Sequence, residues 1–298
     1  MDSGSSADPR GNGESSLPTA RATREASTLL RWAELPGLEL LRANFHRHAY
    51  VPHWHDECMI SSPAYGMQRI RHKGVKRVLG PGTLTLLNPG ELHDGEAEDP
   101  ERGWHHRALF LSPALLAEAV NGHRGGTADE VCFENSVVED ASAASTFLEI
   151  HARLQTAVTT LERETVLAEG LGHLLISAKI VAARDREAAV CRKALGRARD
   201  YLHAGWAEPV RLSALAEIAD LSPYHFLRSF RSHFGLAPHA YQMQLRVIRA
   251  KDLLFDGRAV KDVALEVGFY DQAHLTNVFR RYTGVTPGCV RPGVRLAG

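Results

Sequence analysis

The chain has 298 residues, of which 44% are hydrophobic, and its formal net charge is zero. These values fit a globular protein of two domains and exclude a wholly disordered or fibrous chain. The charge is unevenly distributed, since residues 190–298 contain 16 Lys and Arg against 9 Asp and Glu, and residues 1–189 carry the compensating negative charge. A basic part joined to an acidic part is typical of a protein in which one domain binds a polyanion, although chance variation in surface charge is the other explanation.

The N-terminal segment 1–27 is rich in Ser, Gly, Pro and Asp. It has no apolar core of a secretory signal, so we expect a disordered tail. No apolar run reaches the roughly 18 residues of a membrane span. Cys58, Cys132, Cys191 and Cys289 are scattered without a CxxC pair, which favours free thiols in a reducing compartment. We therefore expect a cytoplasmic protein without a membrane partner.

Residues 38–112 consist of short apolar runs separated by Pro and Gly turn signals. Thr83–Leu87 is a compact strand pattern, and Lys73-Gly74 is the expected tip of a hairpin. Closely spaced short strands with such corners favour a β-sandwich or a barrel. The sequence therefore predicts a mainly-β domain over residues 28–120.

Residues 121–189 are expected to form a linker segment with two long helices, over 141–158 and 161–183. Apolar side chains share one face of each helix, namely Phe147, Ile150 and Leu154 in the first and Leu167, Leu171, Leu174 and Leu175 in the second. These faces can pack against the β-domain, or they can form a dimer interface. A homodimer is therefore one of the expected partners.

The C-terminal part contains the same pattern twice, in units over about 212–233 and 260–282. His225 matches His274, and Phe230 matches Phe279, both at an offset of 49 residues. Before the turn the offset is 48, so the second unit has one extra turn residue. A short apolar helix, a turn, an N-cap and a second helix are the parts of a helix-turn-helix, and duplication makes this interpretation specific.

The second helix of each unit leaves one side free for contact with bases and phosphates in a major groove. The candidate DNA-binding residues are Tyr224, His225, Leu227, Arg228 and Arg231 in the first unit, and Gln272, Ala273, Thr276, Asn277 and Arg280 in the second. We expect the first unit to contribute more base discrimination, because it carries Arg228 next to an aromatic residue.

The segment over about 194–292 resembles the AraC/XylS family of transcription regulators. The motifs that carry the resemblance are Ser222-Pro223-x-x-Phe226-x-Arg228-x-Phe230-Arg231, Gly235-x-x-Pro238, Val263-Ala264-x-x-x-Gly268-Phe269-x-Asp271-Gln272-x-x-Leu275 and Phe279-Arg280-x-x-x-Gly284-x-Thr286-Pro287. The resemblance implies an all-α domain with two helix-turn-helix motifs, and base contacts by Tyr224, Leu227, Arg228, Gln272, Ala273, Thr276 and Asn277. Asn277 and Val290 depart from the family pattern, which affects the DNA sequence recognised and not the fold.

Three histidines of the β-domain are candidate ligand-binding residues. His53 and His55 are two residues apart, and His93 follows a strand and turn. This part is similar to the cupin-type ligand-binding domain of many AraC family members, which implies a barrel that binds a small molecule. Metal-dependent cupins usually have a Glu ligand a few residues after the second His. In this chain Glu57 is only two positions after His55, so the set of metal ligands is incomplete and we expect no cofactor.

We expect His53, His55, Arg71 and His93 to line a pocket for a polar or anionic effector. Bonds from these histidines to strand-end backbone are the purely structural explanation.

The sequence thus predicts a regulator that binds promoter DNA and is controlled by a small-molecule effector in the barrel. A metal-dependent cupin enzyme fused to a DNA-binding domain is the alternative. An architectural DNA-binding protein without a ligand is a third hypothesis.

Overall fold

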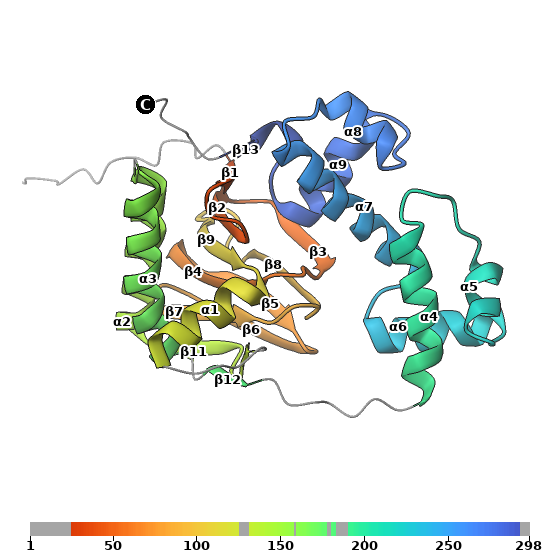
Figure 1. Cartoon of the computed structure of the whole chain (residues 1–298), viewed down its shortest axis with the longest axis horizontal. Coiled ribbons are helices and arrows are strands. Elements are labelled where there is room, and N and C mark those ends of the chain that lie inside the picture. The colour runs from red at the N-terminus through yellow and green to blue at the C-terminus, as the bar shows by residue number, and fades with distance from the viewer. Residues whose placement is uncertain (1–24, 125–130, 158, 178–179, 183–189, 293–298) are drawn as a thin grey trace, which may run out of the picture.

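The computed structural model describes residues 25–124, 131–157, 159–177, 180–182 and 190–292 (Figure 1). Most of the expected N-terminal tail lies outside this part of the chain. The predicted end of the tail at residue 27 is wrong, because residues 26 and 27 belong to the first strand, β1.

Two β-sheets form the N-terminal domain. The order of the larger sheet is β11 (Val137–Glu139), β7 (Thr83–Leu87), β4 (Cys58–Gly66), β9 (Trp104–Leu111), β2 (Leu38–Phe45), β1 (Ala26–Arg31) and β13 (Val290–Pro292). The order of the smaller sheet is β3 (Ala49–His53), β8 (His93–Ala97), β5 (Gln68–His72) and β6 (Val75–Leu79). Short strands β10 (Val131–Phe133) and β12 (Ile180–Ala182) pair separately.

The predicted hairpin between β5 and β6 is confirmed. Lys73 and Gly74 have φ angles of 50° and 79°, and β5 and β6 pair in antiparallel register up to the turn. Positive φ at both central residues is the requirement of the tight turns that match the twist of a β-hairpin.

Three helices pack on one face of the larger sheet, and two of them stand at the left of Figure 1. They are α1 (Pro113–Arg124), α2 (Ala141–Thr156) and α3 (Thr160–Ser177). The larger sheet is buried on both faces, as strand β2 illustrates. Leu38 and Leu40 belong to the core beneath these helices, whereas Leu41 belongs to the hydrophobic cluster on the opposite face. A period of two puts alternate side chains on opposite faces of a sheet.

The apolar faces predicted for α2 and α3 are buried in this core. Phe147, Ile150 and Leu154 of α2 and Leu167, Leu171 and Leu174 of α3 all belong to it. The side chain of Leu175 lies outside the described residues. Packing against the β-domain, one of the two expectations, therefore accounts for these faces. The helix expected to reach residue 183 ends at Ser177, and β12 follows.

The C-terminal domain is helical, and its elements form the two expected units. The first unit has α5 (Leu212–Ile218) and α6 (Pro223–Phe234) after α4 (Val190–Ala204). The second has α8 (Val260–Glu266) and α9 (Gln272–Thr283), and the long helix α7 (Pro238–Phe255) joins the two units. A short 3-10 helix (Pro287–Cys289) leads into β13.

The N-caps predicted for α6 and α9 are confirmed. The side chain of Ser222 accepts a hydrogen bond from the backbone N–H of His225, and Asp271 accepts one from that of His274. The turn before α9 is one residue longer, as the two sequence offsets predict. Capping satisfies N–H groups that a helix cannot pair internally, so these local signals specify where each helix begins.

The two domains are packed together. Strand β13, at the end of the helical domain, adds to the larger sheet by parallel pairing with β1, where Leu29 is opposite Val290. The end of α9 also approaches β3, and a Cβ built on Gly284 would meet the hydroxyl of Tyr50. None of the helices in the described ranges combines the length and apolar character that crossing a membrane requires.

Candidate functional site

The predicted DNA-contacting side of the first unit is exposed on α6. His225, Leu227, Arg228 and Arg231 are all solvent-exposed. The side chain of Tyr224 lies outside the described residues. Phe226 and Phe230 are fully buried on the opposite side of α6. This division of the helix leaves its polar side free for a partner.

The second unit repeats the arrangement on α9. Leu275 and Phe279 are fully buried, while Gln272, Ala273 and Asn277 are exposed and Thr276 is half-buried. The hydroxyl of Thr276 donates to the carbonyl of Gln272, at 2.8 Å. Gln and Asn amides offer a donor and an acceptor together, which suits an adenine edge in the major groove.

Arg280 of α9 is also exposed, but it is already paired with a carboxylate. Its guanidinium forms an ion pair with Glu25, just before β1. The Glu25 carboxylate also accepts hydrogen bonds from the backbone N–H groups of Arg47 and His48, both at 2.8 Å. The N-terminal domain therefore holds one of the candidate DNA-binding residues.

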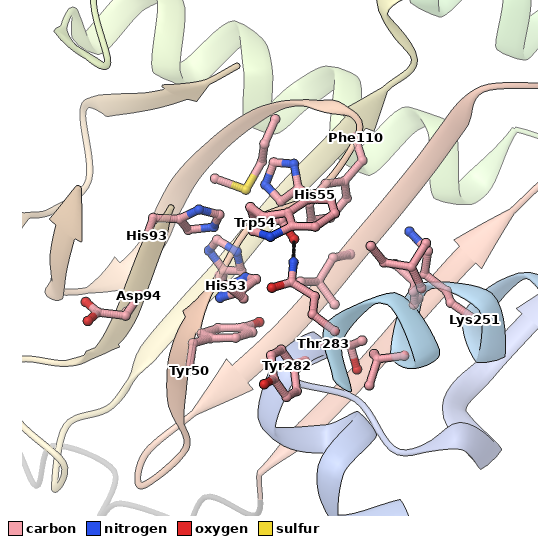
Figure 2. A pocket seen from close by; sticks show the side chains of 18 of the residues that line it. Tyr50, His53, Trp54, His55, His93, Asp94, Phe110, Lys251, Tyr282 and Thr283 are labelled. Atoms are coloured by element: carbon pink, nitrogen blue, oxygen red, sulfur yellow. Dashed lines mark hydrogen bonds between the residues drawn. The ribbon is translucent and has the colours of Figure 1, made fainter. Parts of the chain in front are cut away.

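A cavity of about 80 Å³ lies between the two sheets and is bordered on one side by the helical domain (Figure 2). Its walls from the β-domain include Leu41 and Phe110 of the larger sheet, and Tyr50 and Ile70 of the smaller one. The residues contributed by the helical domain are Gln244, Val247, Ile248 and Lys251 of α7, and Tyr282 and Thr283 of α9. One water needs about 10–15 Å³, so the cavity can hold a small molecule.

The structure brings three of the four predicted effector-binding residues together at this cavity. His53 and His93 are opposite each other on β3 and β8, with ring centroids 4.3 Å apart. The ring of His55 lies 5.0 Å from that of His93. Figure 2 shows the three rings between the sheets.

The fourth predicted residue, Arg71, does not lie in this cavity. Its side chain is exposed and forms an ion pair with Asp94. Along β5 the buried and exposed positions alternate, so Ile70 faces the cavity and Arg71 faces solvent. We therefore leave Arg71 out of the site.

Burial favours the neutral form of the imidazoles in this cavity. Desolvation lowers the pKa of His53 to about 3, with a further contribution from His55, and it holds the pKa of His93 well below the ordinary value. The pKa of His55 is lowered by the same cause. A low-dielectric environment disfavours the charged imidazolium. Among the described residues, no three His, Cys, Asp or Glu side chains lie in an arrangement that could hold a metal ion.

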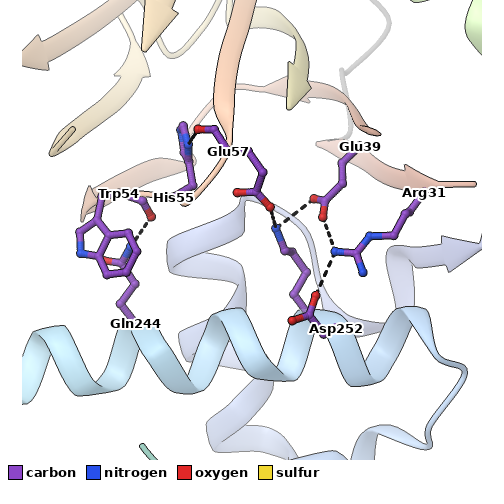
Figure 3. A network of polar contacts seen from close by, with 8 residues as sticks. Arg31, Glu39, Trp54, His55, Glu57, Gln244 and Asp252 are labelled. Atoms are coloured by element: carbon purple, nitrogen blue, oxygen red, sulfur yellow. Dashed lines mark hydrogen bonds and ion pairs between the residues drawn. The ribbon is translucent and has the colours of Figure 1, made fainter. Parts of the chain in front are cut away.

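Lys251 anchors α7 to the β-domain through a buried network of charges (Figure 3). Its ammonium lies 3.0 Å from a carboxylate oxygen of Glu39 and 3.0 Å from one of Glu57. Burial by itself would raise the pKa of Glu57, but Lys251 lowers it to about 2. Arg31 pairs with Glu39 and also with Asp252 of α7, at 3.0 Å for the latter. The network therefore joins strands of one domain to the connecting helix of the other.

The cavity residues that come from the helical domain were not predictable from the sequence. Gln244 and Lys251 lie about 150–200 residues from the histidines along the chain, and no local pattern connects them. The amide of Gln244 donates to the carbonyl of Trp54, next to His53 and His55.

Two family models match the chain. A model described as the AraC-like ligand binding domain matches residues 35–171, and a model described as a helix-turn-helix domain matches residues 215–292. The first match extends beyond the β-domain expected over 28–120 and includes α2 and the greater part of α3, which pack on the larger sheet.

Transcription regulators are among the curated proteins whose sequences are similar to this chain. The uncharacterized HTH-type transcriptional regulator YbfI of Bacillus subtilis is 28% identical over 235 residues, which cover 75% of this chain and 80% of YbfI. The arabinose operon regulatory protein of Escherichia coli is 24% identical, covering 76% of this chain and 78% of that protein. These relatives do not favour the metal-dependent enzyme considered above.

Among solved structures, a single-residue variant of apo ToxT from Vibrio cholerae aligns with a TM-score of 0.56 at 14% identity, covering 85% of this chain and 96% of ToxT. Wild-type ToxT with a bound unsaturated fatty acid aligns with a TM-score of 0.52 at 12% identity, covering 88% of this chain and 98% of ToxT. This likeness shows the two-domain fold.

Proposed function

The chain is an AraC-type transcription regulator with a ligand-binding domain in front of its helix-turn-helix domain, and on that premise we propose that an effector in the barrel cavity controls DNA binding. One observation carries this proposal: α7 joins the two helix-turn-helix units and is also a wall of the cavity. A ligand that prefers one position of α7 shifts the relative placement of the two units by its difference in affinity.

We propose that α6 and α9 enter successive major grooves of a promoter. The candidate DNA contacts on α6 are Tyr224, His225, Leu227, Arg228 and Arg231, and those on α9 are Gln272, Ala273, Thr276, Asn277 and Arg280. Helices that bind one face of B-DNA lie about 34 Å apart. The 18 residues of α7 span about 27 Å, so the width of the units supplies the remainder.

Selection of bound sequences from a random duplex pool tests DNA recognition by the full-length protein. We expect two short preferred motifs separated by about one helical turn, and an affinity that falls steeply with salt concentration. A pool with no enriched motif after repeated selection would show that the protein does not recognise DNA by sequence.

The coupling between cavity and DNA is tested by substitutions on α7. Ile248→Phe adds volume at the cavity, whereas Met243→Leu conserves volume on the same helix away from it. We expect Ile248→Phe to change affinity for the selected DNA severalfold and Met243→Leu to leave it unchanged. Equal affinities for both variants and the parent would contradict control through this cavity.

We further propose that the protein has no catalytic activity and that it acts in the cytoplasm, where the chromosome lies.

A homodimer through α2 and α3 would have to use their outward sides, because the predicted apolar faces are buried internally. Light scattering of the purified full-length protein measures the oligomeric state directly.

A further inference from the structure

The turn of the second helix-turn-helix unit closes in the same way as the turn of the first. The backbone N–H of Leu221 donates to the carbonyl of Ala216 at 2.9 Å, and that of Phe269 donates to the carbonyl of Ala264 at 2.8 Å. The donors are 48 residues apart, and so are the acceptors. The two units therefore correspond residue by residue up to Leu221 and Phe269.

The N-caps that follow are 49 residues apart, and this difference identifies the extra turn residue. Ser222 comes directly after Leu221, whereas Tyr270 stands between Phe269 and Asp271. Tyr270 is thus the inserted residue, and no residue of the first unit corresponds to it. Because the first unit forms its turn without such a residue, the turn itself does not account for Tyr270.

The side chain of Tyr270 projects into solvent from a turn that is fixed at both ends. It is 87% exposed, the largest value among the exposed large hydrophobic side chains of the described residues. Before it, Phe269 is 4% exposed, and after it the carboxylate of Asp271 accepts from the N–H of His274 at 2.7 Å. A covered aromatic ring buries roughly 150–250 Å², and this ring forgoes that gain in the free protein.

Tyr270 lies at the end of α9 that is remote from the β-domain. The other end approaches β3, where a Cβ on Gly284 would meet the hydroxyl of Tyr50. The 12 residues of α9 span about 18 Å. Tyr270 therefore adjoins the exposed candidates Gln272 and Ala273, at the end of a recognition helix whose residues contact base edges.

A side chain that stands just before a recognition helix is placed to meet the DNA backbone, because phosphates border the groove that the helix enters. The hydroxyl of a tyrosine donates hydrogen bonds, and phosphate oxygens accept them. The carboxylate of Asp271 is bonded to the N–H of His274, so it does not compete for this hydroxyl.

We propose that Tyr270 is a DNA-backbone contact of the second unit, in which its hydroxyl donates to a phosphate and its ring packs against the adjoining sugar. This inference rests on the proposed function, because it names a further contact of the same DNA-binding surface. Phosphate contacts fix the register of a protein on the duplex without reading a base, so Tyr270 positions the amides of α9.

Binding titrations of the full-length protein on the duplex selected from the random pool test this contact. Tyr270→Phe removes only the hydroxyl, and Tyr270→Ala also removes the ring. We expect the affinity to fall about fivefold in Tyr270→Phe, the equivalent of one hydrogen bond, and further in Tyr270→Ala. Tyr65→Phe is the matched control, at a tyrosine of β4 that is 52% exposed, and should bind as the parent does.

Parent-like affinity in both Tyr270 variants overturns the proposal. Tyr270→Phe keeps the ring, so it decides the question even if Tyr270→Ala does not fold, as judged by circular dichroism.

Two further readouts separate a phosphate contact from a base contact or a cationic one. The loss in Tyr270→Phe should be equal on duplexes with substituted base pairs in the second motif, and the salt dependence of binding should not change, because a neutral donor releases no counterion. Ethylation of one phosphate beside that motif should weaken the parent and leave Tyr270→Phe unaffected. A loss confined to particular base pairs, or the absence of such a phosphate, overturns the proposal.

Failure of this contact is distinguishable from failure of the proposed function. If the pool yields two motifs and both Tyr270 variants bind like the parent, only the tyrosine contact is wrong. If the pool yields no motif, recognition of DNA by sequence is wrong, and the role of Tyr270 fails with it.

Discussion

The two recognition helices expose different side chains, and this difference decides what each can contact. Arg228 of α6 is a guanidinium that can bind both acceptors of a guanine edge. Gln272 and Asn277 of α9 are amides that suit adenine. An N-cap and a buried phenylalanine position the exposed side chains of α6 and of α9 in the same way. The two units therefore differ in the chemistry of their exposed side chains more than in their geometry.

Arg228→Ala is expected to weaken DNA binding by about 1–3 kcal/mol and to relax the base preference at one half-site. Arg102→Ala is the matched control, because Arg102 is an exposed arginine on the β-domain. Titrations on selected DNA and on point variants of it measure both effects. Equal losses on all DNA sequences would make Arg228 a phosphate contact instead of a base contact.

Glu25→Gln is expected to raise DNA affinity, by up to about fivefold, because it releases Arg280 for a phosphate. The glutamine amide can still accept from the backbone N–H groups of Arg47 and His48, so the local fold should persist. Binding titrations at low salt give the clearest comparison with the parent. A lower affinity in the variant would mean that the ion pair supports the DNA-binding geometry.

At the scale of elements, α7 is the part on which both domains depend. Tyr241 and Leu245 pack with the first unit, while Leu253 and Leu254 pack with the second unit and the β-domain. The network of Lys251, Glu39 and Glu57 adds charge pairing at the same interface, where water is largely excluded.

Lys251→Met should reduce the free energy of unfolding by about 3–5 kcal/mol, because it leaves the largely buried carboxylate of Glu57 without its cation and leaves Glu39 paired with Arg31 alone. Lys261→Met, at an exposed position of α8, should have little effect. Urea denaturation of the full-length variants measures both. Adding Glu57→Gln to Lys251→Met should recover part of the loss, and no recovery would contradict a pairing role.

For the molecule as a whole, buried neutral histidines make stability depend on pH. Burial lowers the pKa of His53 and of His106 to about 3, and that of His48 and of His151 to about 4. In the unfolded chain these groups bind protons below their ordinary pKa of about 6.5. Their contribution to stability is therefore present above pH 6.5 and is lost as the pH falls below it.

We expect the free energy of unfolding to decrease between pH 7.5 and pH 5, by up to about 1.4 kcal/mol per pH unit for each such histidine. Urea denaturation across this range measures the slope, and His53→Gln should make it shallower by about one proton. The carboxylates with lowered pKa, such as Glu57, titrate below this window. A flat profile would mean that these histidines are protonated in the folded protein.

The sequence by itself determined the features that depend on neighbouring residues. Ser222 and Asp271 specify where α6 and α9 begin, because an N-cap acts on N–H groups two or three residues away. Lys73 and Gly74 specify a turn for a similar reason. The duplicated units, the mainly-β domain and the meeting of His53 with His93 were predictable from such signals. The run of charges from Arg69 to Lys73 was compatible with a solvated hairpin, and the alternation along β5 places Arg71 on the solvent side and Ile70 on the buried side.

Only the tertiary structure decided what borders the cavity and what its chemistry is. Lys251 meets Glu39 and Glu57 from about 200 residues away, and β13 joins β1 from the other end of the chain. Such contacts are set by how two domains pack, and no local periodicity encodes them. The neutral state of the histidines depends equally on burial by distant segments, because desolvation is a property of the surrounding volume and not of the adjacent sequence.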